Sequence, residues 1–107
     1  MQAINFKNYK IYYPQFGTIR TLTIDHEPWV VGKDVAEILE YANTAKAIRD
    51  HVDNEDKLTE RIVLSGQNRE AILINESGLY SLILSSKLPK AKEFKRWVTS
   101  EVLLKIQ

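Results

Sequence analysis

The sequence predicts a single α+β domain, in which a small antiparallel β meander and a β-hairpin pack with about four short helices, two of them a helix-turn-helix-like pair. Three observations predict this class. Apolar residues recur with a period of two through residues 18–31, and the period changes to 3.6 after Gly32. A second β-rich stretch spans residues 58–74, and helical spacing returns after Asn75. The 107 residues, 44% of them hydrophobic, suffice for one core.

The first third of the chain predicts three strands joined by two turns. The strands are expected at residues 4–13, 18–25 and 29–31, and the turns at residues 14–17 and 25–28. In the second strand Leu22 and Ile24 alternate with threonines, but Ile19 breaks the alternation. This strand therefore either carries a bulge or is covered on both faces.

Two short helices are expected next. In the first, Asp34 lies in the opening turn, and in the second, Asn43 or Thr44 is the N-cap. The residues expected to be buried are Val35, Ile38, Leu39 and Ala42, followed by Ala47, Ile48 and Val52. Lys46 and Arg49 occupy the outer side of the second helix. Two short helices joined by a short turn are typical of a helix-turn-helix unit, and equally of a plain αα-hairpin.

The second half of the chain predicts a hairpin and two further helices. Residues 58–64 and 69–74 are β-rich and flank a polar tip. Asn75 is the expected N-cap of the following helix, and Pro89 suits the first turn of the last one. An apolar stripe is expected along that last helix, at Ala91, Phe94, Trp97, Val98 and Val102.

Nothing in the sequence supports catalysis, a cofactor or a metal. It has no cysteine, and no partner stands at ligand spacing from its two histidines, His26 and His51. Ser77 lacks the G-x-S-x-G pattern of a nucleophile elbow, and the four glycines are too scattered for a phosphate-binding loop. Neither a signal peptide nor an apolar run long enough to cross a bilayer is present, so we expect a cytoplasmic domain without membrane contact.

Cations gather on one side of the last expected helix. Lys92, Lys95 and Arg96 are three or four residues apart, so they project from one face, opposite the apolar stripe. Further members of this row are Lys87 and Lys90, with Thr99 and Ser100 as neutral donors. Such a row suits the phosphates of DNA, although lysines on a solvated helix face are also common without any function.

The net charge of +1 hides an uneven distribution. Residues 34–60 contain eight acids and three bases, whereas residues 84–107 contain six bases and two acids. This layout can steer an anionic partner to one end of the molecule. Alternatively, both segments are solvated helix faces whose charges cancel.

Three motifs follow one another along the chain. They are Glu27-Pro28-Trp29 with Lys33-Asp34-Val35-Ala36, then Lys46-Ala47-Ile48-Arg49 with His51-Val52, and finally Ile74-Asn75-Glu76-Ser77-Gly78-Leu79-Tyr80 with Ser86-Lys87-Leu88-Pro89-Lys90-Ala91 and Phe94-Lys95-Arg96-Trp97-Val98. Together they resemble the N-terminal domain of the BRO family (Bro-N), found in phage and prophage antirepressors and in large DNA viruses of insects. The third motif is the most specific.

The resemblance implies a compact α+β domain associated with DNA binding, here residues 1–107 as the N-terminal part of a longer protein. In phage proteins of this kind, the whole molecule is taken to counter a repressor of lytic genes. The chain has His26 and Glu40 where the family has turn glycines, and Val30 where it has an aromatic residue. It also has Leu104 where the family has proline, so we expect the final helix to continue past this residue.

The main hypothesis is therefore a duplex-DNA-binding module of a phage or prophage antirepressor-like regulator. The candidate phosphate contacts are Lys90, Lys92, Lys95 and Arg96, with Lys46, Arg49, Arg61 and Arg69 as supplementary contacts. The alternative is a protein-interaction module that binds a phage repressor or self-associates as a homo-oligomer, without touching DNA. Acids interleaved with the helix cations favour that alternative, whereas acids at the opposite end of the molecule favour DNA binding.

Overall fold

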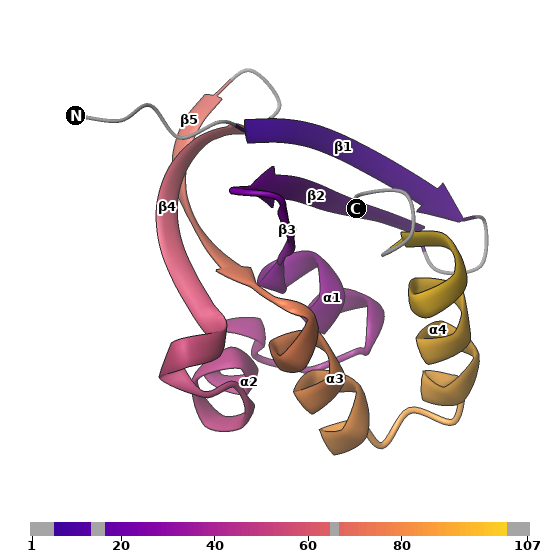
Figure 1. Cartoon of the computed structure of the whole chain (residues 1–107). Coiled ribbons are helices and arrows are strands. Elements are labelled where there is room, and N and C mark those ends of the chain that lie inside the picture. Colours follow the sequence, from indigo (N-terminus) through magenta and orange to yellow (C-terminus); the bar gives the residue numbers. More distant parts are fainter. Residues whose placement is uncertain (1–5, 14–16, 65–66, 103–107) are drawn as a thin grey trace.

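The computed structural model describes residues 6–13, 17–64 and 67–102, and it confirms the α+β class (Figure 1). The elements are, in chain order, β1 (Phe6–Tyr13), β2 (Gly17–Ile24), β3 (Glu27–Val31), α1 (Gly32–Ile38), α2 (Thr44–His51), the 3-10 turn η1 (Asn54–Asp56), β4 (Lys57–Leu64), β5 (Gln67–Ile74), α3 (Glu76–Ser85), α4 (Ala91–Trp97) and the π-helical turn η2 (Val98–Val102). Each expected strand and helix is present, with bounds that differ by a few residues.

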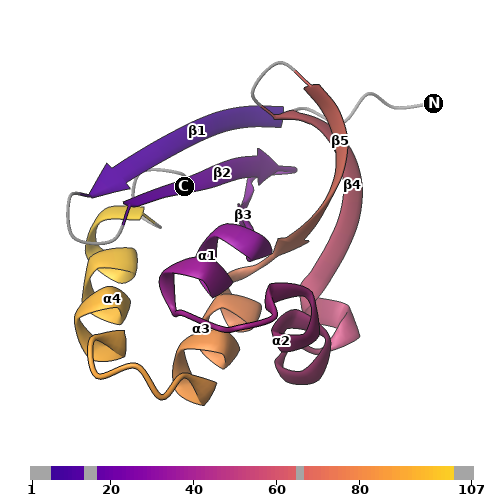
Figure 2. The ribbon, with the colours of Figure 1, turned by 180° about the vertical axis from the view of Figure 1, so that it is seen from behind.

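The five strands form one antiparallel sheet in the order β1-β2-β3-β5-β4. Two hairpins, β1–β2 and β4–β5, are joined through β3, which is the shortest strand and lies at the centre. Figures 1 and 2 show the two hairpins running in different directions, with the helices gathered on one side of the sheet. The helices α1 and α3 lie next to β3 and β5, and α4 lies toward the end of the β1–β2 hairpin, well away from α2.

Apolar residues are buried on both faces of the sheet. On the helix side the buried cluster comprises Ile19, Val30, Val35, Leu39, Ala47, Ile48, Val52, Ile74, Leu79, Leu82, Ile83, Phe94, Trp97 and Val98. On the other face, a smaller cluster comprises Leu22, Ile24, Val31 and Leu73. The ladder between β1 and β2 is continuous, so Ile19 marks no bulge and β2 is instead covered on both faces.

The β2–β3 turn consists of two residues only. Ile24 pairs with Glu27, and the residues between them, Asp25 and His26, have φ of 50° and 67°. Positive φ at both central positions defines the type I′ turn that suits the twist of a hairpin. The predicted turn at residues 25–28 was therefore too long, because Glu27 and Pro28 already belong to β3. His26 keeps the geometry that glycine adopts more readily.

The C-terminal end of α1 also has a non-glycine residue with positive φ. The N–H of Glu40 donates to the carbonyl of Glu37, and the N–H of Tyr41 donates to the carbonyl of Ala36, both at 3.0 Å. These two bonds form a Schellman motif, which requires a left-handed residue after the helix, and Glu40 supplies it with φ of 60°. The helix thus ends before Ala42, which is exposed, and the prediction that Ala42 is buried was wrong.

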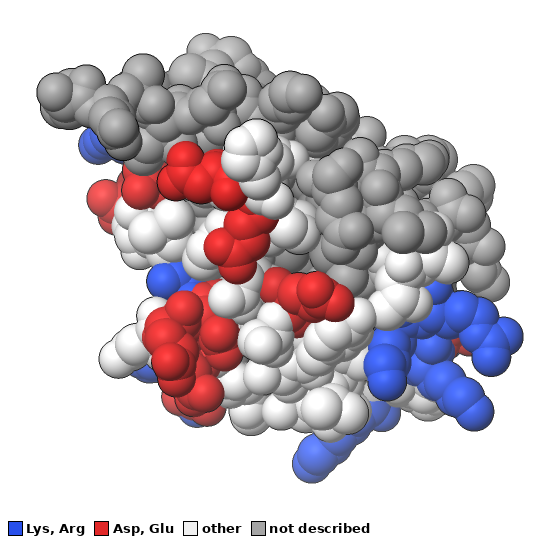
Figure 3. Space-filling model, in the orientation of Figure 1, with Lys and Arg blue, Asp and Glu red and all other residues white. Residues whose placement is uncertain are grey.

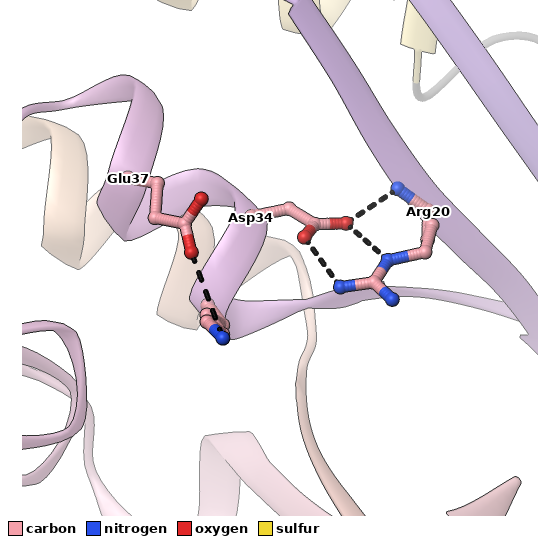
Figure 4. A network of polar contacts seen from close by, with 4 residues as sticks. Arg20, Asp34 and Glu37 are labelled. Carbon is pink, nitrogen blue, oxygen red and sulfur yellow. Dashed lines mark hydrogen bonds and ion pairs between the residues drawn. The ribbon is translucent and has the colours of Figure 1, made fainter. Parts of the chain in front are cut away.

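Where β3 ends, the side chain of Asp34 provides the hydrogen-bond acceptor for β2. The pairing of β2 with β3 ends at Thr21 and Val30, and the chain turns into α1 after Val31. Arg20 therefore has no strand partner on the β3 side. The Asp34 carboxylate accepts the Arg20 backbone N–H at 2.9 Å and the guanidinium Nε and Nη2 at 2.8 and 2.7 Å (Figure 4). These hydrogen bonds raise the pKa of Arg20. The first turn of α1 is thereby tied to β2 by three bonds to one carboxylate.

Asparagine N-caps begin both α2 and α3: Asn75 was the predicted cap of α3, and Asn43 is the one of the two candidates that caps α2. Asn43 accepts the Lys46 N–H at 3.0 Å, and Asn75 accepts the Gly78 N–H at 2.9 Å. The Asn75 amide also donates to the Asp56 carboxylate at 3.1 Å, which fastens α3 to η1. A Cβ on Gly78 would lie 3.1 Å from the Asp56 carbonyl oxygen, so this glycine permits the close contact.

The last helix begins later than predicted. Lys90 is the N-cap of α4, and Pro89 lies in the turn before it instead of in the first helical turn. The ring of Pro89 still favours the bend between α3 and α4, because proline fixes φ and cannot continue α3. The expected continuation past Leu104 lies outside the described residues.

The helices α1 and α2 are consecutive and are joined by residues 39–43. Their role as a DNA-reading helix-turn-helix stays a prediction.

Replacing Glu40 by glycine should stabilise the domain. Glycine adopts the left-handed conformation without a Cβ clash, so we expect Glu40→Gly to raise the free energy of unfolding by about 0.5–1 kcal/mol. Urea denaturation measures the change. The matched control is Glu37→Gly, the same substitution inside α1, which should lower it by about 0.5–1 kcal/mol. A loss of stability in both variants would contradict the proposed strain at Glu40.

Removing the charge of Asp34 should weaken the domain. The amide that replaces the carboxylate in the variant Asp34→Asn accepts at one oxygen only, so the fork with Arg20 is lost and we expect the free energy of unfolding to fall by about 1–3 kcal/mol. Glu37→Gln makes the same chemical change at the exposed Lys33–Glu37 pair, where N and O are 3.8 Å apart. That control should cost less than about 0.5 kcal/mol in the same denaturation experiment. Equal costs would contradict a special role for Asp34.

Candidate nucleic-acid interface

The apolar side of α4 is built into the core, as predicted. Phe94 and Val98 are fully buried and Trp97 is nearly so, and the Phe94 and Trp97 rings pack with their centroids 5.7 Å apart. Trp97 is therefore a packing residue and not a platform on which bases stack. Because this side of the helix faces inward, the residues between these positions must project into solvent.

Those outward residues, with two lysines of the preceding loop, form a surface that we call the α4 basic face. It consists of Lys87, Lys90, Lys92, Lys95 and Arg96, all exposed. Lys95 Nζ lies 5.9 Å from the centroid of the Tyr80 ring, within the range of a cation–π contact. The pKa of Tyr80 is raised, mainly because its side chain is partly buried. No ion pair involves any of these five cations in the part of the chain that the structure describes, so their charges are available to an anion.

The neutral donors expected beside these cations are engaged within their own helix. The Thr99 hydroxyl donates to the carbonyls of Lys95 and Arg96 at 3.1 and 3.0 Å, and the Ser100 hydroxyl donates to the Arg96 carbonyl at 2.8 Å. These bonds join the first residues of the wider turn η2 to carbonyls in the last turn of α4. The contact surface is thus cationic, with lysine and arginine as its donors.

The supplementary candidates on α2 lie elsewhere. Lys46 and Arg49 are exposed on α2, which is on the far side of α1 and α3 from α4 (Figures 1 and 2). The Lys46 ammonium donates to the Asp50 carboxylate. This bond is the main reason why the pKa of Asp50 is lowered. The charge of Lys46 is therefore partly offset at its own site, whereas Arg49 has no ion pair among the described residues.

The arginines of the β4–β5 hairpin also stand apart from the α4 basic face. Arg61 lies on β4 directly opposite Glu70 of β5, and Arg69 is exposed on β5. Opposite charges at such cross-strand positions attract each other. Both strands lie on the side of the molecule away from α4 (Figures 1 and 2). The structure therefore unites Lys90, Lys92, Lys95 and Arg96 in one surface but does not bring the four supplementary residues to it.

Acids and the α4 cations occupy separate regions of the surface. Figure 3 shows the acidic side chains over the centre and the left of this face and a large group of basic side chains at the right, over α4, while a few further basic side chains lie at the left beside the acids. Within the described part of α4 the one acid is Glu93. The acids of residues 34–60 are thus not interleaved with the α4 cations on this face. Sequence separation indicated this segregation, but only the fold could place the two segments at different ends.

Among the described residues, no three His, Asp or Glu side chains are close enough together to hold a metal ion. None of the helices in the described ranges is long and apolar enough to cross a membrane.

Comparison with known proteins agrees with the motifs. The BRO family, N-terminal domain, matches residues 18–104. The chain is 34% identical over 123 residues to the Bro-N domain-containing protein 289L of Invertebrate iridescent virus 6, covering 98% of this chain and 28% of the relative. It is 33% identical over 119 residues to the Bro-N domain-containing protein ORF2 of Autographa californica nuclear polyhedrosis virus, covering 96% and 36%.

A bacterial protein is similar as well. An uncharacterized protein of Haemophilus influenzae is 38% identical over 81 residues, which cover 76% of this chain and 40% of that protein. The chain thus spans less than half the length of each of these relatives. No solved structure matches it. The family match covers most of the chain and includes all three motifs, so the chain belongs to the BRO family through its N-terminal domain.

Proposed function

We propose that this domain is the duplex-DNA-binding module of a phage- or prophage-type antirepressor-like regulator that acts in the host cytoplasm. The α4 basic face would contact the phosphates. The observation that carries the proposal is the group of five exposed cations without an acidic partner among the described residues, presented at one end of the molecule. Neutralising phosphates with such cations releases counterions and supplies most of the affinity of nonspecific binding.

The chemistry of this face favours weak sequence specificity. Its cations are four lysines and one arginine, and lysine ammonium groups act as point charges toward phosphate. The neighbouring hydroxyls, which could otherwise read base edges, donate to their own helix. The domain therefore serves as an anchor, and residues beyond it in the longer protein would supply the action on a repressor.

Charge reversal on α4 tests the proposal. In the variant Lys92→Glu/Lys95→Glu/Arg96→Glu, three phosphate contacts are lost, so we expect roughly a hundredfold weaker binding of labelled duplex at low salt. The dependence of log affinity on log salt should become less steep by about 3. Titrations of duplex at several salt concentrations measure both quantities.

The matched control makes the same change in net charge elsewhere. Lys46→Glu/Arg49→Glu/Arg61→Glu reverses three supplementary candidates on α2 and β4. If α4 holds the main contacts, this control changes the salt slope by less than about 1. An equal loss in both variants would mean that overall charge matters and α4 does not, whereas undiminished binding by the α4 variant would remove the α4 basic face from the mechanism.

Two features of the surface favour the alternative function, a protein-interaction module. A hollow of about 660 Å³ lies between the α1–α2 turn and the α3–α4 loop, with Tyr41, Leu88 and Pro89 in its wall. Close to it in sequence, Leu84 is 78% exposed, an unusual setting for a large apolar side chain. A repressor or a second copy of the domain could bury both.

Substituting Leu84 separates the two functions. Leu84→Asp should leave duplex binding within about twofold, because Leu84 is not a cation and contacts no phosphate. If the alternative is right, the same variant loses capture of the cognate repressor in a pull-down, or shifts the domain to monomer in light scattering. The control Ser77→Asp adds the same charge at an exposed residue of α3 that does not line the hollow, and it should retain partner binding.

A further inference from the structure

A cavity lies at the place where the central strand ends. The strands β2 and β5 each have eight residues, but β3, between them, has five, so a notch opens beyond Val31. The beginnings of α1 and α2 close this notch only in part. What remains is a cavity of about 300 Å³, bounded by β2, the end of β3, β5, α1 and α2. That volume is at the lower end of the range for small-molecule sites.

The rim and the floor of the cavity differ in chemistry. Three bases from three separate elements line it, namely Arg20 on β2, Lys33 on α1 and Arg69 on β5. The floor is apolar and includes Val31, Ile48 and Ile72. A site with an apolar floor and a few convergent charged groups is the common design of pockets for small organic ions.

The rim retains capacity for an anion. Arg20 uses Nε and one terminal nitrogen on Asp34, and Figure 4 shows the other terminal nitrogen turned away from that carboxylate. Among the described residues, Lys33 has a single ion pair, at 3.8 Å with Glu37, and this pair is weak because the Lys33 side chain is 66% exposed. One acid, Glu70, also lines the cavity, so the bases among the lining residues outnumber the acids by three to one. Asp34 holds Arg20 in a fixed orientation, which lowers the entropic cost of using it for binding.

We propose that this cavity binds a phosphate monoester that carries a compact flat or apolar group, of the size of a mononucleotide. The phosphate contacts Arg20, Lys33 and Arg69 at the rim, since guanidinium forks and ammonium groups are the usual partners of phosphate. The attached group lies on the floor formed by Val31, Ile48 and Ile72 and leaves water there. The site is formed by elements other than α4 and its preceding loop, so it is a second function and does not depend on the proposed contacts with DNA.

Titration of the isotope-labelled domain with AMP, adenosine and inorganic phosphate, in the absence of DNA, tests the proposal. AMP should bind saturably below about 10 mM and shift the amide signals of Ala45, Ile48 and Ala71. Inorganic phosphate and adenosine should each bind at least about tenfold more weakly, because each makes only half of the contacts. Failure of AMP to saturate, or equal affinity for AMP and inorganic phosphate, would overturn the assignment.

Two variants show whether the rim is responsible. Lys33→Gln and Arg69→Gln change exposed side chains, and each should weaken AMP binding at least about fivefold with thermal stability retained. The control Lys92→Gln removes the same charge from the α4 basic face and should leave AMP affinity within about twofold. AMP binding that is lost equally in the control, or that is unchanged in both rim variants, would refute the cavity as the site.

Discussion

The fold depends on how the sheet is completed at the point where its central strand stops. β3 holds the two hairpins together, yet it turns into α1 after five residues, so Arg20, which pairs with β1 on one side, has no strand partner on the β3 side. Asp34 supplies the missing acceptor and at the same time binds the Arg20 side chain. An unpaired N–H in a half-buried place is costly, so this carboxylate lets a short central strand exist. It also sets the direction in which α1 leaves the sheet.

From that fixed start, the helices are placed by burial and caps. Asn75 and Gly78 bring α3 against η1, and α3 with the sheet forms the surface on which Phe94, Trp97 and Val98 seat α4. The cations of α4 face solvent because the other side of a short helix is fully committed to the core. The family motif around residues 74–98 is thus mainly a packing framework, and the proposed function belongs to the few cations it presents.

Two turns hold non-glycine residues in a conformation that glycine adopts more readily. His26 and Glu40 both adopt positive φ, in a type I′ turn and in a Schellman motif. A left-handed non-glycine residue costs on the order of 1 kcal/mol, which the hydrogen bonds and the core beside each turn offset. Glu40 is exposed, so its charge meets solvent and adds no burial cost.

Local sequence patterns were enough to define the elements and the two faces of α4. Period, caps and turn residues predicted five strands, four helices, the Asn75 cap and the burial of Phe94, Trp97 and Val98, because these depend on neighbours within one or two turns. For the cap of α2 they left Asn43 and Thr44 as alternatives. The meeting of distant residues, in contrast, followed from the tertiary fold alone. Arg20 and Asp34 are 14 positions apart, the cavity joins residues of five elements, and the α4 cations stand away from Lys46, Arg49, Arg61 and Arg69. Strand order sets those distances, and no local pattern carries the strand order.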